Sequence, residues 1–442
     1  MVRPPKQESQ TQSPSRPFGM AGWVLLAVIG VVYTWSFIDR QVLTLLVQPI
    51  KADLGLSDTR MGLLLGFSFA LFYSLMNLPA GYLIDRYNRR GLIAIGAVVW
   101  SAMTIVCGFA RSFGQLFAGR AGVGFSESVI APASFSLIRD AVEPSRRASA
   151  YSVLAMAPYA GSALALLLGG ALLAAASDGR FSAWPVLGAM KPWQCVLIIV
   201  GAAGFPLTLL LFLVKEPARR VDVQGAKPAG YGQVWSHMKA NGWIYFLLLS
   251  FTTLQAMLTF GSSAWLPALA SRQWGLSPPQ VGRVMGLAYL ILPPIGLFAG
   301  GFVMDWLTAR GRSLLDYGIL ASVISLIAIV AIPFAPTVEL MWVAICVKLA
   351  FAGSFYAVGA TILAQVTPSH LMGKQTALYL LAQNLIGQGM GPMVVALLSD
   401  RFFEGGHALG YGLATMAVVV GILATLVGVA LRSVLMRWRS VD

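Results

Sequence analysis

Residues 55–66 read GLSDTRMGLLLG and residues 275–286 read GLSPPQVGRVMG, so one pattern of glycine, leucine and serine returns 220 positions later. A shared offset over a long stretch is not expected by chance. The repeat predicts two copies of one structural unit. The same offset relates Gly81 to Gly301, Asp85 to Asp305, Arg90 to Arg310 and Gly91 to Gly311, while an offset of 224 relates Pro144-Ser145 to Pro368-Ser369.

The composition decides the environment in which these copies fold. Of the 442 residues, 57% are hydrophobic and only 11% are charged. A water-soluble domain carries about 25% charged residues, so a soluble fold is excluded, and so are disordered, coiled-coil, collagen and disulfide-scaffold chains. What remains is a helical protein that crosses the bilayer many times. The net charge of +14 falls in clusters between apolar runs, which indicates membrane topology and no nucleic-acid partner.

Apolar stretches long enough to cross a bilayer recur along the chain. They predict an all-α protein of twelve transmembrane helices in two pseudo-symmetric six-helix bundles, at 20–214 and 241–435. A cytoplasmic linker is expected at 215–240, a disordered tail at 1–19 and a second tail at 436–442. The twelve stretches lie at 20–48, 59–84, 91–110, 113–138, 147–176, 192–214, 241–270, 279–306, 313–334, 338–366, 373–399 and 410–434.

Twelve crossings place both ends of the chain on one side of the membrane. That side carries 20 lysines and arginines in its loops and tails, and the other side carries 8. Because cytoplasmic loops are enriched in these residues, both tails are expected in the cytoplasm, in the inner (plasma) membrane of a cell. The end of the linker, YGQVWSHMK at 231–239, predicts either a short helix on the membrane surface or a solvated connection.

Two units of six crossings have the same orientation, so an axis along the membrane normal relates them. Repeats of this kind bind cargo near the middle of the membrane, between the halves, and rock one half against the other. The three cysteines and three histidines form no metal-binding motif, and no nucleophile–histidine set lies at membrane depth. We therefore expect neither an enzyme nor a cofactor, packed reduced cysteines, and histidines in solvated loops.

Residues 81–90, GYLIDRYNRR, match the G-x-L-x-D-R-x-x-R-R pattern of the second loop in the major facilitator superfamily. Residues 301–310, GFVMDWLTAR, resemble a weaker second copy that lacks the arginine after the aspartate. The chain is therefore identified as similar to that superfamily over its whole membrane region. Segments at 39–64, 119–140, 214–219 and 384–392 resemble its spinster-like branch, whose animal members move lysolipids and sphingoid phosphates.

The resemblance implies a latch that closes the cytoplasmic side. Gly81 would allow a neighbouring helix to approach, and Asp85 would face the positive N-terminus of the eleventh crossing near Gly373. The arginines of this loop would pair with acids such as Glu143 or Glu216. Plain positive-inside charge explains the same arginines without a latch. The latch candidates are Gly81, Asp85, Arg86, Arg89, Arg90, Glu143, Asp305 and Arg310.

Five charged residues fall inside the predicted crossings, where each costs about 2.5–3.5 kcal/mol if unpaired. Arg120 and Glu127 are seven residues apart and lie on one face of a helix. Asp39 and Arg120 have comparable depths, so an Asp39–Arg120 pair is expected, and Arg40 would reach Glu127 or the cargo. The resemblance implies proton coupling by Asp39 and Glu127, and a role in cargo binding or gating for Arg40 and Arg120. Lys348 is expected at a cavity.

A cavity with more cations than acids favours an anionic cargo. Together with the resemblance, this makes a lysophospholipid or sphingoid phosphate the first choice, moved with protons by alternating access. A proton-linked transporter of a water-soluble organic anion and a proton-independent lipid scramblase stay open. A monomer in the lipid bilayer is sufficient. Aromatic residues that are candidates to line an acyl-chain groove are Tyr33, Trp35, Phe37, Phe67, Phe69, Tyr73, Phe351, Phe355, Tyr356 and Tyr379.

The topology is tested with single cysteines and a membrane-impermeant label. Cysteines near Arg147 and Gly311 should react only from the cytoplasmic side, and cysteines near Lys51 and Arg180 only from outside. Labelling near Arg147 from outside would contradict the twelve-crossing arrangement.

Overall fold

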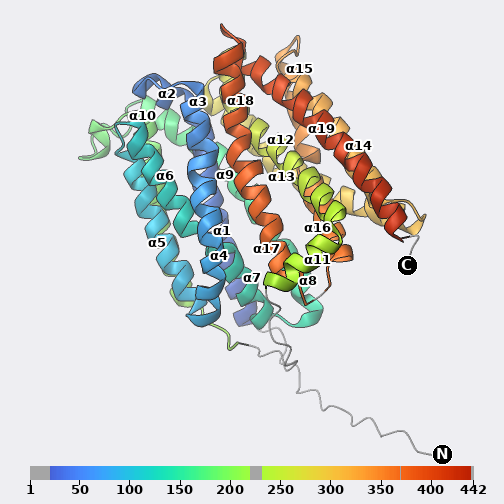
Figure 1. Cartoon of the computed structure of the whole chain (residues 1–442). Coiled ribbons are helices and arrows are strands. Elements are labelled where there is room, and N and C mark those ends of the chain that lie inside the picture. The colour runs from blue at the N-terminus through green and yellow to red at the C-terminus, as the bar shows by residue number, and fades with distance from the viewer. Residues whose placement is uncertain (1–19, 220–230, 369, 440–442) are drawn as a thin grey trace, which may run out of the picture.

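The computed structural model describes residues 20–219, 231–368 and 370–439 (Figure 1). Twelve helices in these residues are long and apolar enough to cross a membrane, which confirms the predicted crossings. The predicted tail at 1–19 lies outside the described residues.

Six crossings form the N-terminal half, and some consist of more than one helix. Their elements are α1 (Met20–Leu45), α2 (Val47–Leu54), α3 (Asp58–Gly62), η1 (Leu63–Phe67), α4 (Ser68–Arg86), α5 (Arg89–Gly108), α6 (Phe113–Glu127), α7 (Ile130–Ala141), α8 (Pro144–Ala155), α9 (Ala157–Ser177), η2 (Leu187–Ala189), α10 (Pro192–Leu209) and η3 (Leu210–Leu213).

Six crossings also form the C-terminal half, after the short linker helix α11 (Tyr231–Ala240). Its last helix continues to Arg439, into the stretch predicted to be a tail. The elements are α12 (Gly242–Trp274), α13 (Pro278–Ala309), α14 (Leu314–Ala331), α15 (Val338–Phe351), α16 (Ser354–Val366), α17 (Met372–Ala382), η4 (Gln383–Gln388), α18 (Gly389–Phe402) and α19 (Ala408–Arg439).

The repeated Gly-Leu-Ser encodes the end of one helix and the start of the next. Gly55 and Gly275 adopt φ angles of 62° and 63°, the left-handed conformation that glycine tolerates best. Two residues later, the Ser57 side chain accepts a hydrogen bond from the backbone N–H of Arg60 and caps α3. Ser277 forms a capping box with Gln280 at the start of α13. The same three residue types therefore make the same turn in both halves.

The fourth and tenth crossings both break at corresponding positions. Ser128 and Val129 separate α6 from α7, and Ala352 and Gly353 separate α15 from α16. These pairs are related by the offset of 224 that the sequence already showed. Glu127 is the last residue of α6, so the repeat places it beside a helix break.

The second and eleventh crossings each contain a π-helical segment, η1 and η4, and these segments contact one another across the two halves. Glycine makes the approach possible, because a Cβ atom on Gly66 would lie 2.9 Å from the carbonyl oxygen of Gln388. π-turns inside α-helices are frequent at functional sites.

Hydrophobic packing joins the halves at one end. One cluster of buried residues contains members of both halves, including Val42 and Leu64 with Trp265 and Met285. Two further clusters each belong to one half: one includes Ile84 and Ile138, and the other contains Leu315 and Val366. Figure 1 places α2 and α3 at the end opposite to α8 and α11. The halves therefore share a core near α3 and keep separate cores toward α8 and α11.

Candidate substrate and proton site

The four charged residues of the first and fourth crossings lie together between α1 and α6. Asp39, Arg120 and Glu127 are 2%, 4% and 0% exposed. The Nε–H of Arg40 donates to Oε2 of Glu127 over 2.5 Å. This pair offsets the cost of burying each charge alone. Of the two partners expected for Arg40, Glu127 is the one that it meets here.

Aromatic rings enclose the guanidinium of Arg40. Its Cζ atom lies 4.6 Å from the ring centroid of Phe37, 4.5 Å from that of Phe69 and 4.8 Å from that of Tyr73. Cation–π contacts of this kind contribute about 0.5–2 kcal/mol each. Three of the aromatic residues that we expected along an acyl-chain groove therefore contact a charged side chain instead.

Asp39 does not pair with Arg120 through its carboxylate. The hydroxyl of Thr104 on α5 donates to Oδ2 of Asp39, and Nη1 of Arg120 donates instead to the backbone carbonyl of Asp39 at 3.4 Å. No ion pair within 4.0 Å joins the two side chains in the described structure. The predicted pair is therefore wrong for this conformation, because a third helix supplies the partner of the carboxylate. A lone threonine in an apolar stretch was too weak a signal to predict it.

Several polar atoms of this cluster are buried without a partner among the described residues. They are Nη2 of Arg40, Nε of Arg120 and Oε1 of Glu127. The guanidinium donors match the oxygens of a carboxylate or a phosphate. The free oxygen of Glu127 can carry a proton. The cluster therefore has the groups needed to bind an anion and to exchange a proton.

Lys348 lies apart from this cluster, inside the C-terminal half. It is 1% exposed, and its Nζ donates to the Ser263 hydroxyl and to the Thr259 carbonyl at 3.4 Å. A cavity of about 10 Å³ adjoins it, with Gln255 and Ser354 in its lining. That volume suits about one water molecule. The expected position at a cavity is therefore seen, but this cavity is too small for a cargo.

Arg89 is the centre of the predicted latch region. It donates to Asp140 and, through Nε, to Glu216 at 3.0 Å, and it also binds the carbonyl of Pro217. Arg90 donates to the carbonyl of Val214. Burial alone would raise the pKa of the Glu216 carboxyl, but the backbone N–H and guanidinium of Arg89 hold it below its ordinary value. These bonds join the start of the linker, at 214–217, to the loop before α5. None of them reaches the C-terminal half.

The other latch candidates make no bond between the halves in the described structure. Gly81 is exposed with no atom within 4 Å of a Cβ placed on it, so the expected close helix approach is absent here. Asp85 is exposed and forms no hydrogen bond or ion pair with α17 in the described structure, and the buried clusters of the two halves are separate at this end. Arg86 binds Tyr82, Arg310 stacks on Trp306 at 3.8 Å, and Glu143 and Asp305 form no described ion pair.

A different set of polar contacts joins the halves at the opposite end. Asp58 receives two hydrogen bonds of 2.6 Å from Arg272. The backbone N–H and the hydroxyl of Thr59 donate to Asp400 at 2.7 and 2.8 Å, and Ser399 donates to Asp58 at 3.5 Å. We call these five residues the outer clasp. Arg272 also contacts the side-chain amide of Gln48 on α2, so the hydrogen bonds shown between the two halves of the described structure all lie at this end.

The outer clasp was not predicted from the sequence, although the repeat contains a signal for it. Asp58 and Thr59 stand where the second copy has Pro278 and Pro279. A pair of polar residues in only one of two copies breaks the symmetry, and such a break marks a contact that the copies cannot both make. The partner Arg272 was counted only as an outer loop charge.

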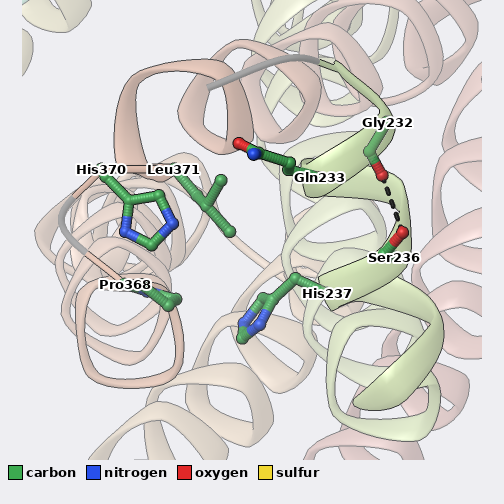
Figure 2. A pocket seen from close by; sticks show the side chains of 7 residues that line it. All are labelled: Gly232, Gln233, Ser236, His237, Pro368, His370 and Leu371. Carbon is green, nitrogen blue, oxygen red and sulfur yellow. Dashed lines mark hydrogen bonds between the residues drawn. The ribbon is translucent and has the colours of Figure 1, made fainter. Parts of the chain in front are cut away.

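A pocket of about 660 Å³ lies beside α11, at the end of the molecule opposite to α3 (Figure 1). Figure 2 shows the residues that line it. His237 lies half-buried on α11, where its ring contacts the carbonyl of Val366 at 3.1 Å. The expectation of a solvated loop histidine is therefore wrong for His237. The pocket is separate from the buried charges. Its lining consists of Gly232, Gln233, Ser236, His237, Pro368, His370 and Leu371.

Comparison with known proteins identifies the class. The model of the Major Facilitator Superfamily matches residues 29–392. A bacterial homologue of the human lysosomal transporter Spinster, in an inward-facing and unoccupied conformation, is similar with a TM-score of 0.79 and 26% identity over 95% of this chain and 96% of that one.

Curated relatives are similarly distant. An MFS-type efflux pump of Mycolicibacterium smegmatis is 26% identical, over 96% of this chain and 95% of its own. A probable galactarate/D-glucarate transporter, GudP of Bacillus subtilis, is 25% identical over 85% of each chain. The chain belongs to the major facilitator superfamily: it is a multi-pass membrane transporter and not an enzyme. Its predicted likeness to the spinster-like branch is confirmed.

Asp58→Asn should weaken the outer clasp, because the charge that receives both bonds from Arg272 is removed. Hydrogen bonds to charged groups contribute about 1.5–3 kcal/mol, so the fraction of molecules open at this end should rise about tenfold or more. Spin labels at Arg111 and Glu404 report the distance across this end. Asp178→Asn, an exposed site, is the control. Unchanged distances in Asp58→Asn would show that hydrophobic packing alone holds the end closed.

Asp85→Asn should have the opposite effect. Asp85 is exposed here, so the variant should leave this conformation intact and disfavour only the conformation closed near α8 and α11. A carboxylate at a helix N-terminus contributes about 0.3–2 kcal/mol, so the shift is partial. Labels at Arg146 and Gly311 measure it, with Asp178→Asn, exposed after α9, as the control. Equal effects of both variants would remove the special role of Asp85.

Proposed function

We propose that this protein is a proton-coupled secondary transporter of an anionic cargo that works by alternating access in the bacterial inner membrane. The observation that carries the proposal is the buried Arg40–Glu127 pair, in which one oxygen of the carboxylate and one nitrogen of the guanidinium stay without a partner. A proton competes with Arg40 for the carboxylate of Glu127, and an anion competes with Glu127 for the guanidinium of Arg40.

Proton binding and cargo binding are linked through Arg40. When Glu127 is ionised, Arg40 is engaged and the buried charge is balanced. When Glu127 takes up a proton, Arg40 loses its counter-ion and is free to bind the anionic group of the cargo together with Arg120. The cargo then restores the balance of charge. Binding of one proton therefore favours binding of one anionic group.

Asp39 is the second proton site of the proposal. Its carboxylate accepts from Thr104 on α5 while its carbonyl accepts from Arg120 on α6, so Asp39 connects three helices. Protonation of Asp39 removes its negative charge and weakens the hydrogen bond from Thr104. The contact between α1 and α5 becomes weaker as a result. We propose that Asp39 and Glu127 together sense whether the site is occupied.

Alternating access would exchange two closures. The outer clasp and the shared core close one side here, and the loop around Asp85 would close the other side when the halves rock. With both tails in the cytoplasm, the present conformation is inward-facing. Each monomer would carry a complete pathway, surrounded by the lipid bilayer.

Two cargo classes fit the arginines equally well. The spinster-like likeness supports a lysophospholipid or sphingoid phosphate. Relatives described as galactarate/D-glucarate and D-galactonate transporters support a water-soluble organic anion. Both offer oxygens with negative charge, which is the shared requirement of Arg40 and Arg120.

Glu127→Gln tests the proposal in proteoliposomes with an imposed pH gradient. The amide mimics a permanently protonated side chain, so gradient-driven accumulation should be lost while anion binding is kept within about twofold. Glu339→Gln, exposed at the start of α15, is the matched control and should behave as the wild type. Accumulation by Glu127→Gln at the wild-type rate would move the coupling role to Asp39. Arg120→Ala should impair binding as well as transport.

A further inference from the structure

Three polar side chains form a stripe on the eleventh crossing. Gln375, Tyr379 and Gln383 are spaced four residues apart, so they lie on one face of the helix. They are 0%, 3% and 1% exposed. Both polar atoms of each glutamine and the tyrosine hydroxyl lack a partner with good hydrogen-bond geometry among the described residues, and the Tyr379 hydroxyl only approaches the side chains of Gln383 and Thr252. We call these residues the amide stripe.

Packing alone does not explain the amide stripe. A buried polar group without a partner costs about 1–3 kcal/mol, and native proteins contain few of them. The two other buried glutamines are paired, because Gln255 donates to the Ser322 hydroxyl and Gln194 donates to the carbonyl of Ala110. Gln41 and Gln273 each leave one buried amide atom unpaired, whereas Gln375 and Gln383 each leave both unpaired. The unpaired amides on one face of one helix therefore indicate a missing partner.

The surroundings connect the amide stripe to the arginine site. The Tyr379 hydroxyl lies against Gly359 of α16, where an added Cβ would collide with it, and close to Thr252 and Gln383. Tyr356 on α16 is near enough to interact electrostatically with Tyr379 and also with Tyr33 and Tyr73 of the other half. Tyr73 contacts Arg40. Polar groups thus continue from the amide stripe across the halves to Arg40.

We propose that the amide stripe is a subsite that hydrogen-bonds hydroxyl groups of the anionic cargo, while Arg40 and Arg120 hold its negative group. An amide offers a donor and an acceptor, and a phenol offers both in one atom, which is what a row of hydroxyls requires. The cargo class is a hydroxylated anion: a free hydroxy acid or the head group of a lysolipid. The inference rests on the proposed function only in requiring an anionic cargo.

Matched ligand pairs test the subsite with the full-length protein. D-glucarate and adipate have the same six-carbon dicarboxylate frame, but only D-glucarate carries hydroxyls. A lysophosphatidate and its 2-deoxy analogue, which keeps the acyl chain, the ester and the phosphate but lacks the free hydroxyl, form the lipid pair. Wild-type protein should prefer the hydroxylated member of one pair, and that pair identifies whether the cargo is water-soluble or a lipid.

Gln383→Leu and Gln375→Leu should each weaken binding of the preferred hydroxylated ligand about 2–10-fold, which corresponds to the loss of one neutral hydrogen bond. Binding of the hydroxyl-free member of the same pair should change by less than about twofold. Because each variant removes unsatisfied groups, its thermal stability without ligand should not fall. Gln233→Leu, exposed on α11, is the control.

Several outcomes would overturn the subsite. Equal weakening of both members of a pair would show a structural role, and no preference of the wild type within either pair would exclude hydroxyl recognition. Loss of the hydroxyl preference in Gln383→Leu while Glu127→Gln still drives accumulation would support the subsite and contradict the coupling proposal. An unchanged hydroxyl preference in Gln383→Leu, together with loss of accumulation in Glu127→Gln, would support coupling and contradict the subsite.

Discussion

Charge buried among apolar helices must be balanced nearby, and this constraint shapes the whole molecule. Arg40 and Glu127 balance one another inside the N-terminal half. Arg89 lies between Asp140 and Glu216 at the end of the same half. Arg272 and Lys51 both pair with Asp58 at the other end. Most of these contacts join two or more chain segments, so the pairing that buried charges require also positions the site.

Lys348 shows what happens where the balance is incomplete. Its ammonium contacts a hydroxyl and a carbonyl but no carboxylate in the described structure. The N-terminal half carries the buried acids, and the C-terminal half carries this lone cation and the amide stripe. The two halves therefore share one pattern but differ in chemistry: one half buries carboxylates beside arginines, and the other offers neutral and cationic donors.

The sequence predicted the features that depend on periodicity and composition. The crossings, the repeat and the grouping of Asp39, Arg40, Arg120 and Glu127 follow from apolar length, a fixed offset and helix spacing. It did not predict the Thr104 partner of Asp39. That contact depends on side-chain rotamers and on the rotation of α5 about its axis, and neither can be read from hydrophobic periodicity. It also missed Asp58 with Arg272, which are 214 residues apart and meet only when the halves close. Asp85 is exposed here, and its role in a latch of another conformation stays a prediction, because one sequence is shared by all conformations.

The π-turns at η1 and η4 have a consequence for how the chain tolerates changes in length. A residue inserted into a regular α-helix turns everything beyond it by about 100°, which would move a whole crossing out of register with its neighbours. A π-turn already contains one residue more than an α-turn. Deleting one residue within Leu63–Phe67 or Gln383–Gln388 would restore an ordinary helix and leave both flanking faces pointing as before. During evolution, each π-helical segment is therefore a place where one codon can be gained or lost while the two ends of the crossing keep the same orientation toward neighbouring helices.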